Sequence, residues 1–301
     1  MAHFLSRKTL ALILAAAAGL TAVEGLAQST SAKAETEAFR KQREAEIGGP
    51  TGWVALVGLH WLAPGTHTIG RARDNAVVLA APSSPDRLGV LTVTETSVSL
   101  QVASGVDARV KGQAVTTVDL RAGGPESGLT VGGMTVVVIR RSGRIGLRVW
   151  DSAGAPRAAF KGLQWMPIDA AWRIDARFVP HEPVPRMKIL NVLGDTVEMA
   201  NPGYVAFTIG GQEYRLEALL ESANAKELFF MFRDATSNKT TYGAGRYLYT
   251  ELPKDGRVVV DFNRAMNPPC AFTEFATCPL PPAANRLPIA VTAGERGQIL
   301  H

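Results

Sequence analysis

The sequence predicts an all-β protein made of two successive β domains. Short apolar runs recur along the chain, and clusters of Gly, Pro, Asp and Ser separate them at close intervals, which is typical of strands joined by turns. The 29 glycines and 18 prolines are spread along the chain and suit turns better than long helices. At 301 residues the chain is long enough for two domains.

The first 27 residues have the layout of a secretory signal peptide. Arg7 and Lys8 form a positive start, residues 10–20 are apolar, and residues 25–27 offer small side chains for cleavage. An uncleaved membrane anchor is the alternative, and it fits less well because the apolar stretch is short. We therefore expect an exported protein, periplasmic or secreted, with no membrane span once the leader is removed.

The charge distribution argues against nucleic-acid binding. The formal net charge is only +5, and no run of five basic residues occurs. The densest basic stretch contains Arg140, Arg141, Arg144 and Arg148 around a Ser-Gly turn. We interpret it as a solvated hairpin rather than a binding patch.

Residues 28–50 precede the predicted β domains. Residues 28–33 are small and polar and predict a flexible stub, whereas residues 34–47 are charged and helix-prone, with Phe39 and Ile47 as their few large apolar residues. A Gly-Gly-Pro sequence follows and predicts the helix end. We expect an exposed helix leading into the first domain.

Residues 51–157 predict an N-terminal β-sandwich, because many short strands follow one another closely. The expected strands are 53–62, 66–69, 76–79, 89–93, 97–102, 115–120, 129–139 and 145–150.

Residues 158–301 predict a C-terminal β domain, a curved sheet or barrel. Residues 158–176 are interpreted as a connector, and the Pro-rich stretch beyond residue 264 is expected to cap the sheet. The expected strands are 188–193, 196–199, 204–209, 212–217, 228–234, 246–252, 257–263 and 289–292.

The chain has two cysteines, Cys270 and Cys278. In an oxidising compartment two neighbouring cysteines most simply form one disulfide, and the intervening residues leave room for the chain to turn back. A free thiol pair with a redox role is the alternative, but no cationic residue adjoins either cysteine to lower its pKa.

Common catalytic signatures are absent from the sequence. There is no Gly-x-Ser-x-Gly, His-Glu-x-x-His, Cys-x-x-Cys, P-loop or dinucleotide fingerprint. His60 and His67 stand near strand ends, where ordinary surface or core roles are the favoured interpretation over a metal site. We expect no cofactor and no metal ion.

A polar cluster is predicted on a hairpin near the C-terminus. Strands 246–252 and 257–263 flank a Pro-Lys-Asp-Gly turn, and antiparallel pairing across it would place Arg246, Asp261 and Asn263 on one face. Two interpretations stay open: a structural network that pins the tail, or a ligand pocket. The candidate residues are Asp234, Tyr242, Arg246, Asp261, Asn263, Asn267, Asn285, Arg286 and Glu295.

Several motifs carry a resemblance to a known family. The C-terminal stretch Asp-Phe-Asn-Arg-Ala-Met-Asn-Pro-Pro-Cys at 261–270, then Thr-Cys-Pro-Leu-Pro-Pro at 277–282, Asn-Arg-Leu at 285–287 and Ala-Gly-Glu at 293–295, resembles the domain of unknown function 1684 family. Thr-Tyr-Gly-Ala-Gly-Arg-Tyr at 241–247 fits the same family. The resemblance covers about residues 52–296 and implies no particular activity.

A second resemblance lies in the first domain. Thr-Ile-Gly-Arg at 68–71, with Asp74 and Asn75, is similar to forkhead-associated sandwiches. It implies a shared sandwich shape rather than phosphopeptide binding, because residues 82–88 contain serines without a following His or Asn.

These features leave two functional classes. The favoured one is a binding protein that holds a small polar ligand on the C-terminal β domain. The alternative is a periplasmic hydrolase-like enzyme that uses Asp234, Asp261 and Glu295, but no nucleophile–base pair can be recognised in the sequence. The ligand, the oligomeric state and any protein partner are left unspecified.

Overall fold

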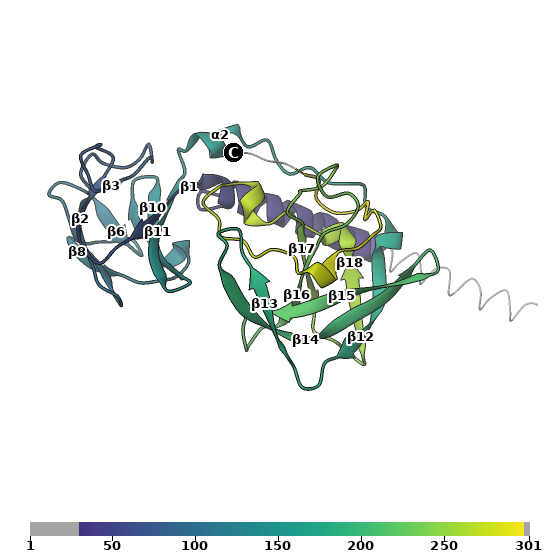
Figure 1. Cartoon of the computed structure of the whole chain (residues 1–301). Coiled ribbons are helices and arrows are strands. Elements are labelled where there is room, and N and C mark those ends of the chain that lie inside the picture. Colours follow the sequence, from purple (N-terminus) through teal and green to yellow (C-terminus); the bar gives the residue numbers. More distant parts are fainter. Residues whose placement is uncertain (1–29, 298–301) are drawn as a thin grey trace, which may run out of the picture.

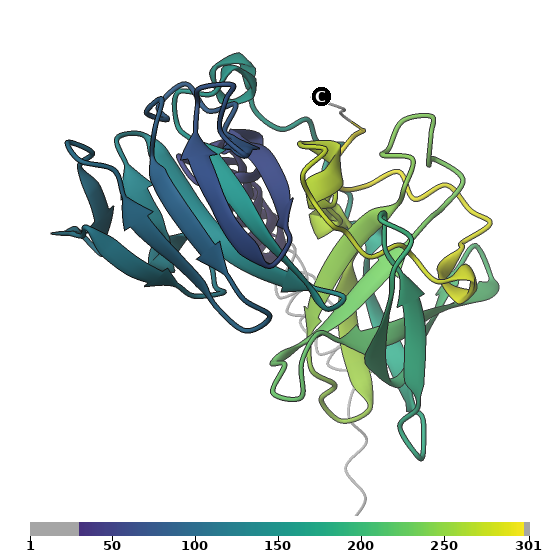
Figure 2. The same cartoon turned by 60° about the vertical axis from the view of Figure 1, so that its left-hand side comes forward.

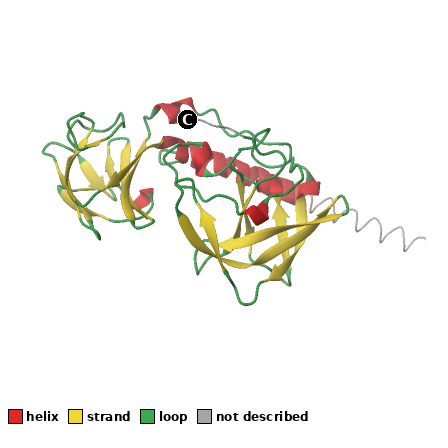
Figure 3. Cartoon of the chain, in the orientation of Figure 1, coloured by secondary structure: helices red, strands yellow, loops and turns green. Residues whose placement is uncertain are grey.

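The computed structural model describes residues 30–297, and nearly all of its regular elements are strands (Figure 3). The prediction of an all-β fold is confirmed. The predicted signal peptide lies outside the described residues. Within residues 30–297 no helix is both long and apolar enough to cross a membrane.

The N-terminal part is a sandwich of two antiparallel sheets around one core. The six-stranded sheet has the order β1-β11-β10-β9-β6-β7, and the five-stranded sheet has the order β3-β2-β4-β5-β8, in which only β2 and β3 run parallel. In β4, Leu91 and Val93 enter the core while Thr92 faces solvent, which is the period-two alternation of a half-buried strand. The strands are β1 (Leu56–Leu62), β2 (Gly65–Gly70), β3 (Val77–Val78), β4 (Gly89–Val93), β5 (Val98–Val102), β6 (Ala108–Val110), β7 (Gln113–Ala114), β8 (Thr117–Leu120), β9 (Leu129–Val131), β10 (Met134–Arg141) and β11 (Arg144–Asp151).

The C-terminal part is a strongly curved, nearly closed sheet of seven strands. Its order is β17-β16-β15-β14-β12-β18, with β13 paired to β14 (Figures 1 and 2). The tail after β18 caps this sheet, because Leu287, Val291 and Ala293 join its core. The strands are β12 (Arg173–Pro180), β13 (Arg186–Leu190), β14 (Thr196–Ile209), β15 (Gln212–Leu220), β16 (Glu227–Phe232), β17 (Arg246–Glu251) and β18 (Arg257–Asp261).

Short helical turns join these strands. They are η1 (Trp53–Ala55), η2 (Pro125–Ser127), α2 (Ala155–Ala159), η3 (Ala170–Trp172), η4 (Phe262–Arg264), η5 (Pro269–Ala271) and η6 (Ala283–Asn285).

The predicted hairpin between β17 and β18 is wrong. β17 pairs with β16, which sets Arg246 opposite Phe232, and β18 pairs with β12, which sets Asp261 opposite Arg173. Because β17 and β18 pair with β16 and β12, the turn between β17 and β18 does not determine their pairing. Arg246 lies on the face of Leu248, toward the barrel core, whereas Asp261 points outward to the N-terminal helix.

The N-terminal helix, residues 30–48, lies along the C-terminal part (Figure 1). The predicted helix exists, but one of its faces is not exposed. Thr36 and Ile47 are buried, and Arg40 and Arg43 donate hydrogen bonds to backbone carbonyls of the second part. These positions share one side of a helix, so the long arginine side chains can cover the barrel surface while the opposite side meets solvent.

The two parts meet where the tail packs on the outer face of the six-stranded sheet. Along β11, Leu147 and Val149 enter the sandwich core, so Arg148 and Trp150 face the other way. Phe275 of the tail packs against the apolar cluster that contains Trp150. Arg148, on the same face of β11, lines a cleft between the two parts.

Candidate binding cleft

The predicted polar residues separate into distinct clusters. Arg246 forms a buried ion pair with Asp234, with a distance of 2.6 Å between Nη2 and Oδ2, and also donates to the carbonyl oxygen of Val291 at 3.0 Å. Burial lowers the pKa of the Arg246 guanidinium, and Asp234 opposes that shift. Gly245 precedes Arg246 with a φ of +109°, and a Cβ there would lie 2.7 Å from the Phe232 carbonyl oxygen.

A second cluster is centred on Glu295. Its two carboxylate oxygens accept from the Asn267 backbone N–H at 3.0 Å and from the Asn267 side-chain amide at 2.9 Å. Arg43 of the N-terminal helix lies 3.9 Å from the carboxylate. Burial raises the pKa of Glu295 to about 7, against the lowering influence of Arg43 and Asn267.

The remaining predicted residues hold other parts of the fold together. Asp261 accepts from Asn263 and from the hydroxyl of Thr36. The predicted meeting of Arg246, Asp261 and Asn263 is therefore wrong, because the last two belong to the helix-docking side of the barrel.

Asn285 bonds both the N–H and the carbonyl of Glu217 and so fixes the tail to β15. Tyr242 donates to the Cys270 carbonyl at 3.1 Å, and Arg286 is exposed.

The disulfide between Cys270 and Cys278 is present and lies in the capping tail.

Of the nine predicted site residues, only Asn267 lines the cleft between the two parts.

This cleft has a volume of about 450 Å³ and uses residues from both parts. The β10–β11 hairpin, the helix and η1 form one side, and the barrel with its tail forms the other. Its apolar lining includes Trp53, Met199, Met266, Tyr247 and Tyr249.

Arg148 is the most unusual residue of the cleft. It is only 8% exposed, its guanidinium lies 5.3 Å from the Trp53 ring centroid, and it donates to the Thr277 hydroxyl at 3.2 Å. Burial and the nearby Arg141 lower its pKa to about 10, so it stays cationic at neutral pH. The interpretation of this basic stretch as a solvated hairpin is wrong for Arg148, because β11 turns this side chain toward the second part.

Unpaired buried polar atoms concentrate among the residues that line this cleft. Within residues 30–297, six buried side-chain nitrogen or oxygen atoms have no hydrogen-bond partner. Three of them belong to lining residues: Arg148 Nε, Arg43 Nε and Asn267 Oδ1. Buried polar groups in native proteins are nearly always satisfied, so these three atoms distinguish the cleft from most of the described structure.

The acidic group of the cleft is Glu221, close to the hydroxyl of Tyr249. Burial raises the pKa of Glu221, and the interaction with Tyr249 opposes that rise. Burial also raises the pKa of both Tyr249 and Tyr247, and Tyr247 donates to the Pro279 carbonyl at 2.6 Å.

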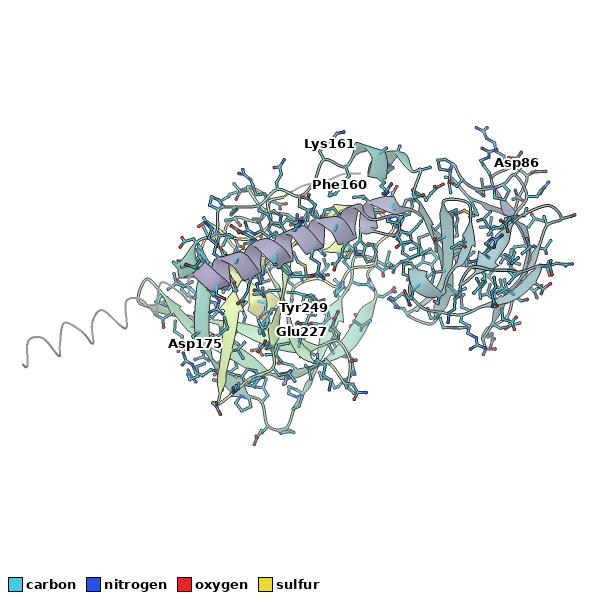
Figure 4. All side chains as sticks on the ribbon, turned by 180° about the vertical axis from the view of Figure 1, so that it is seen from behind. Asp86, Phe160, Lys161, Asp175, Glu227 and Tyr249 are labelled. Atoms are coloured by element: carbon cyan, nitrogen blue, oxygen red, sulfur yellow. A yellow bond between two sulfur atoms is a disulfide. The ribbon has the colours of Figure 1, made fainter. Side chains whose placement is uncertain are left out.

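A second groove, of about 520 Å³, lies where the barrel stays open between β17 and β18. Figure 4 shows Tyr249 and Glu227 beneath the N-terminal helix, with Asp175 farther along the same groove. Two of its arginines form ion pairs there, Arg257 with Asp175 and Arg264 with Glu35. Across the described part of the chain, no group of three His, Cys, Asp or Glu side chains is placed to hold a metal ion.

Comparison with known proteins gives a family and no activity. A family model described as a protein of unknown function (DUF1684) matches residues 158–296. The solution NMR structure of an uncharacterised protein of Haloarcula marismortui is 35% identical, covers 47% of this chain and 79% of that chain, and has a TM-score of 0.41. No curated protein matches the chain. The region matched by the family model holds the barrel side of the cleft, whereas the β10–β11 hairpin lies before it.

Proposed function

This chain belongs to the DUF1684 family of proteins of unknown function, and from that premise we propose that it binds a small polar ligand in the cleft between its two β parts. The observation that carries the proposal is the pair of buried polar atoms without a hydrogen-bond partner on two cleft residues, Nε of Arg148 and Oδ1 of Asn267. A cavity of about 450 Å³ with an apolar lining and a few convergent polar groups suits a small molecule.

The proposal includes export, as a periplasmic or secreted protein. The leader of residues 1–27 and the disulfide between Cys270 and Cys278 support it. A fusion of residues 1–30 to a reporter should be secreted and trimmed near Ala27. Recovery of the reporter only inside the cell, with Met1 intact, would contradict export.

The hydrolase alternative needs titratable groups within reach of a bound molecule. Glu221 and Tyr249 are such groups in the cleft, whereas Glu295 is fully buried behind Asn267. If the wild type converts a bound compound and the Glu221→Gln variant binds it without converting it, the enzymatic alternative is favoured.

A thermal-shift screen of a metabolite library tests the binding proposal. A ligand should raise the melting temperature of the wild type in a concentration-dependent way. The Val197→Trp variant should lose this effect, because Val197 is exposed at the cleft and a larger side chain fills it. Val184→Trp is the matched control, since Val184 is exposed and lines neither of the two cavities described above. Equal stabilisation of both variants would contradict the proposed site.

A further inference from the structure

The charges that line the cleft are unbalanced. Three guanidinium groups line it, from Arg43, Arg141 and Arg148, against the single carboxylate of Glu221. Arg43 has the buried Glu295 as its partner. Within residues 30–297, neither Arg141 nor Arg148 has a carboxylate within salt-bridge distance: Arg141 donates to a backbone carbonyl and Arg148 to a hydroxyl.

The fold holds these two arginines on one surface. In the β10–β11 ladder, Arg141 pairs with Arg144, and Arg148 pairs with Val137. Val137 and Arg141 lie four residues apart on β10, so both point away from the sandwich core, and Arg148 shares that face. Both side chains line the cleft.

Keeping a guanidinium buried without an anion is unfavourable. A buried charge usually has an opposite charge and further hydrogen bonds to offset its desolvation. Trp53 and the Thr277 hydroxyl contact Arg148, but its Nε has no acceptor. Arg141 adds a second positive charge nearby and so raises the cost of keeping Arg148 charged.

Resting on the proposed function, we propose that the ligand carries an oxyanion, a carboxylate or phosphate group, which Arg148 and Arg141 bind beside Thr277. The guanidinium fork matches the oxygens of such groups, and charge-assisted hydrogen bonds are stronger than neutral ones. The rest of the ligand is apolar or aromatic, because Trp53 and Met199 line the same cleft.

Four probes that share a phenyl ring test the inference. They are phenyl phosphate and phenylacetate as anions, phenylacetamide as the neutral analogue and phenethylamine as the cation. Titration calorimetry, with intrinsic tryptophan fluorescence as a second readout, should show binding of the anions and weaker or no binding of the other two. Raising the salt concentration should weaken the binding of the anionic probes more than that of the neutral probe.

Arginine variants locate the anion. Arg148→Gln should weaken anion binding by about 10- to 100-fold, the range expected when a charged hydrogen-bond partner is lost. Arg141→Gln should weaken it less, and this exposed substitution serves as the second variant should Arg148→Gln fail to fold. Arg140→Gln is the matched control: it removes an arginine from the same hairpin, outside the cleft, and should leave binding unchanged.

The outcomes separate the two proposals. A neutral or cationic probe that binds as tightly as the anions, and that Val197→Trp excludes, overturns the oxyanion while keeping the cleft. Anions that bind equally to wild type and Val197→Trp overturn both. If neither anion binds at millimolar concentration, the oxyanion assignment fails, while a hit from the metabolite screen retains the proposed function.

Discussion

The Arg246 guanidinium and the Asp234 carboxylate lie 2.6 Å apart, and both side chains are only 1% exposed. Arg246 also donates to the carbonyl oxygens of Val291 and Ala293, so the pair joins the start of β17 to the capping tail. Asp234 in turn accepts from the Thr236 backbone N–H at 2.6 Å. The network therefore supports the structural interpretation of Arg246 rather than a role in a pocket.

Removing one member of this pair should strongly destabilise the protein. Arg246→Met leaves the Asp234 carboxylate buried without its partner, which typically costs about 3–5 kcal/mol of unfolding free energy. Urea denaturation measures the loss.

The exposed pair of Arg257 and Asp175 provides the control for this measurement. Arg257→Met should change the denaturation midpoint little, because solvent screens exposed ion pairs. Equal effects of the Arg246 and Arg257 substitutions would show that burial of the first pair is energetically unimportant.

Glu295 should make stability depend on pH. Burial raises its pKa in the folded protein from 4.5 to about 7, so between these values the folded state binds a proton that the unfolded state releases. The contribution of this group to stability is therefore fully present below pH 4.5 and is lost as pH rises to about 7. The loss amounts to about 3 kcal/mol at 1.36 kcal/mol per pKa unit.

Glu295→Gln isolates this effect. Urea denaturation from pH 4 to 8 measures the unfolding free energy of the wild type and of the variant. The value for the wild type should fall relative to that of the variant as pH rises. Glu95→Gln, an exposed carboxylate elsewhere, should show a flat difference. A flat difference for Glu295→Gln as well would mean that its pKa is the same in both states.

The strand pattern was sufficient to predict two β parts but not the neighbours of each strand. Residues 173–180 form β12, yet the first of them lie within the predicted connector of residues 158–176. In β12, Ile174 and Ala176 pack toward the barrel core, and the alternating charged residues hide this pattern from a search for apolar runs. Without β12, the apparent partner of β18 was β17, and the faces of Arg246 and Asp261 were misassigned.

The cleft escaped prediction for a related reason. Arg148 lies in a basic stretch that alone resembles a solvated hairpin, and only contact with the tail buries it. The period-two alternation along β11 does predict that Arg148 and the core-facing Leu147 lie on different faces of the sheet. Nothing in the local sequence indicates that Arg148 contacts Thr277, which lies more than a hundred residues later in the chain. Arg43 was not predicted as a cleft residue either, because the sequence of the helix does not indicate that one of its polar sides is buried.

The disulfide should contribute to stability and to the cleft. It joins residues 8 positions apart, and closing so short a loop stabilises by about 2–3 kcal/mol in the chain-entropy model. The double variant Cys270→Ser with Cys278→Ser should unfold at lower urea concentration. It should also bind the cleft ligand more weakly, since Cys278 and Thr277 line the cleft.

Thiol titration provides the check on this pairing. Unreduced wild type should show no free thiol until it is denatured and reduced. Two titratable thiols in unreduced protein from an oxidising compartment would contradict a structural disulfide and favour the redox alternative.

An ion pair joins the β10–β11 and β13–β14 hairpins at the cleft. Arg144, at the start of β11, binds Asp195 in the turn between β13 and β14, and its guanidinium stacks 4.4 Å from the Trp61 ring centroid. The two hairpins carry cleft residues on either side of this contact, Arg141 on one and Val197 on the other. Arg144→Gln should therefore loosen the cleft entrance while leaving global stability nearly unchanged, because both partners are partly exposed.

Two measurements separate a loosened entrance from a loss of fold. Amide exchange in the turn at 191–195 should accelerate in Arg144→Gln, and acrylamide should quench the total tryptophan fluorescence more readily, whereas core strands keep their protection. High salt should bring the wild type toward the variant, since it screens this exposed pair. Arg186→Gln, which removes an arginine from the same β13–β14 hairpin without touching the N-terminal part, is the matched control. If exchange in the turn is equally fast in wild type and in both variants, the Arg144–Asp195 pair does not hold the cleft closed.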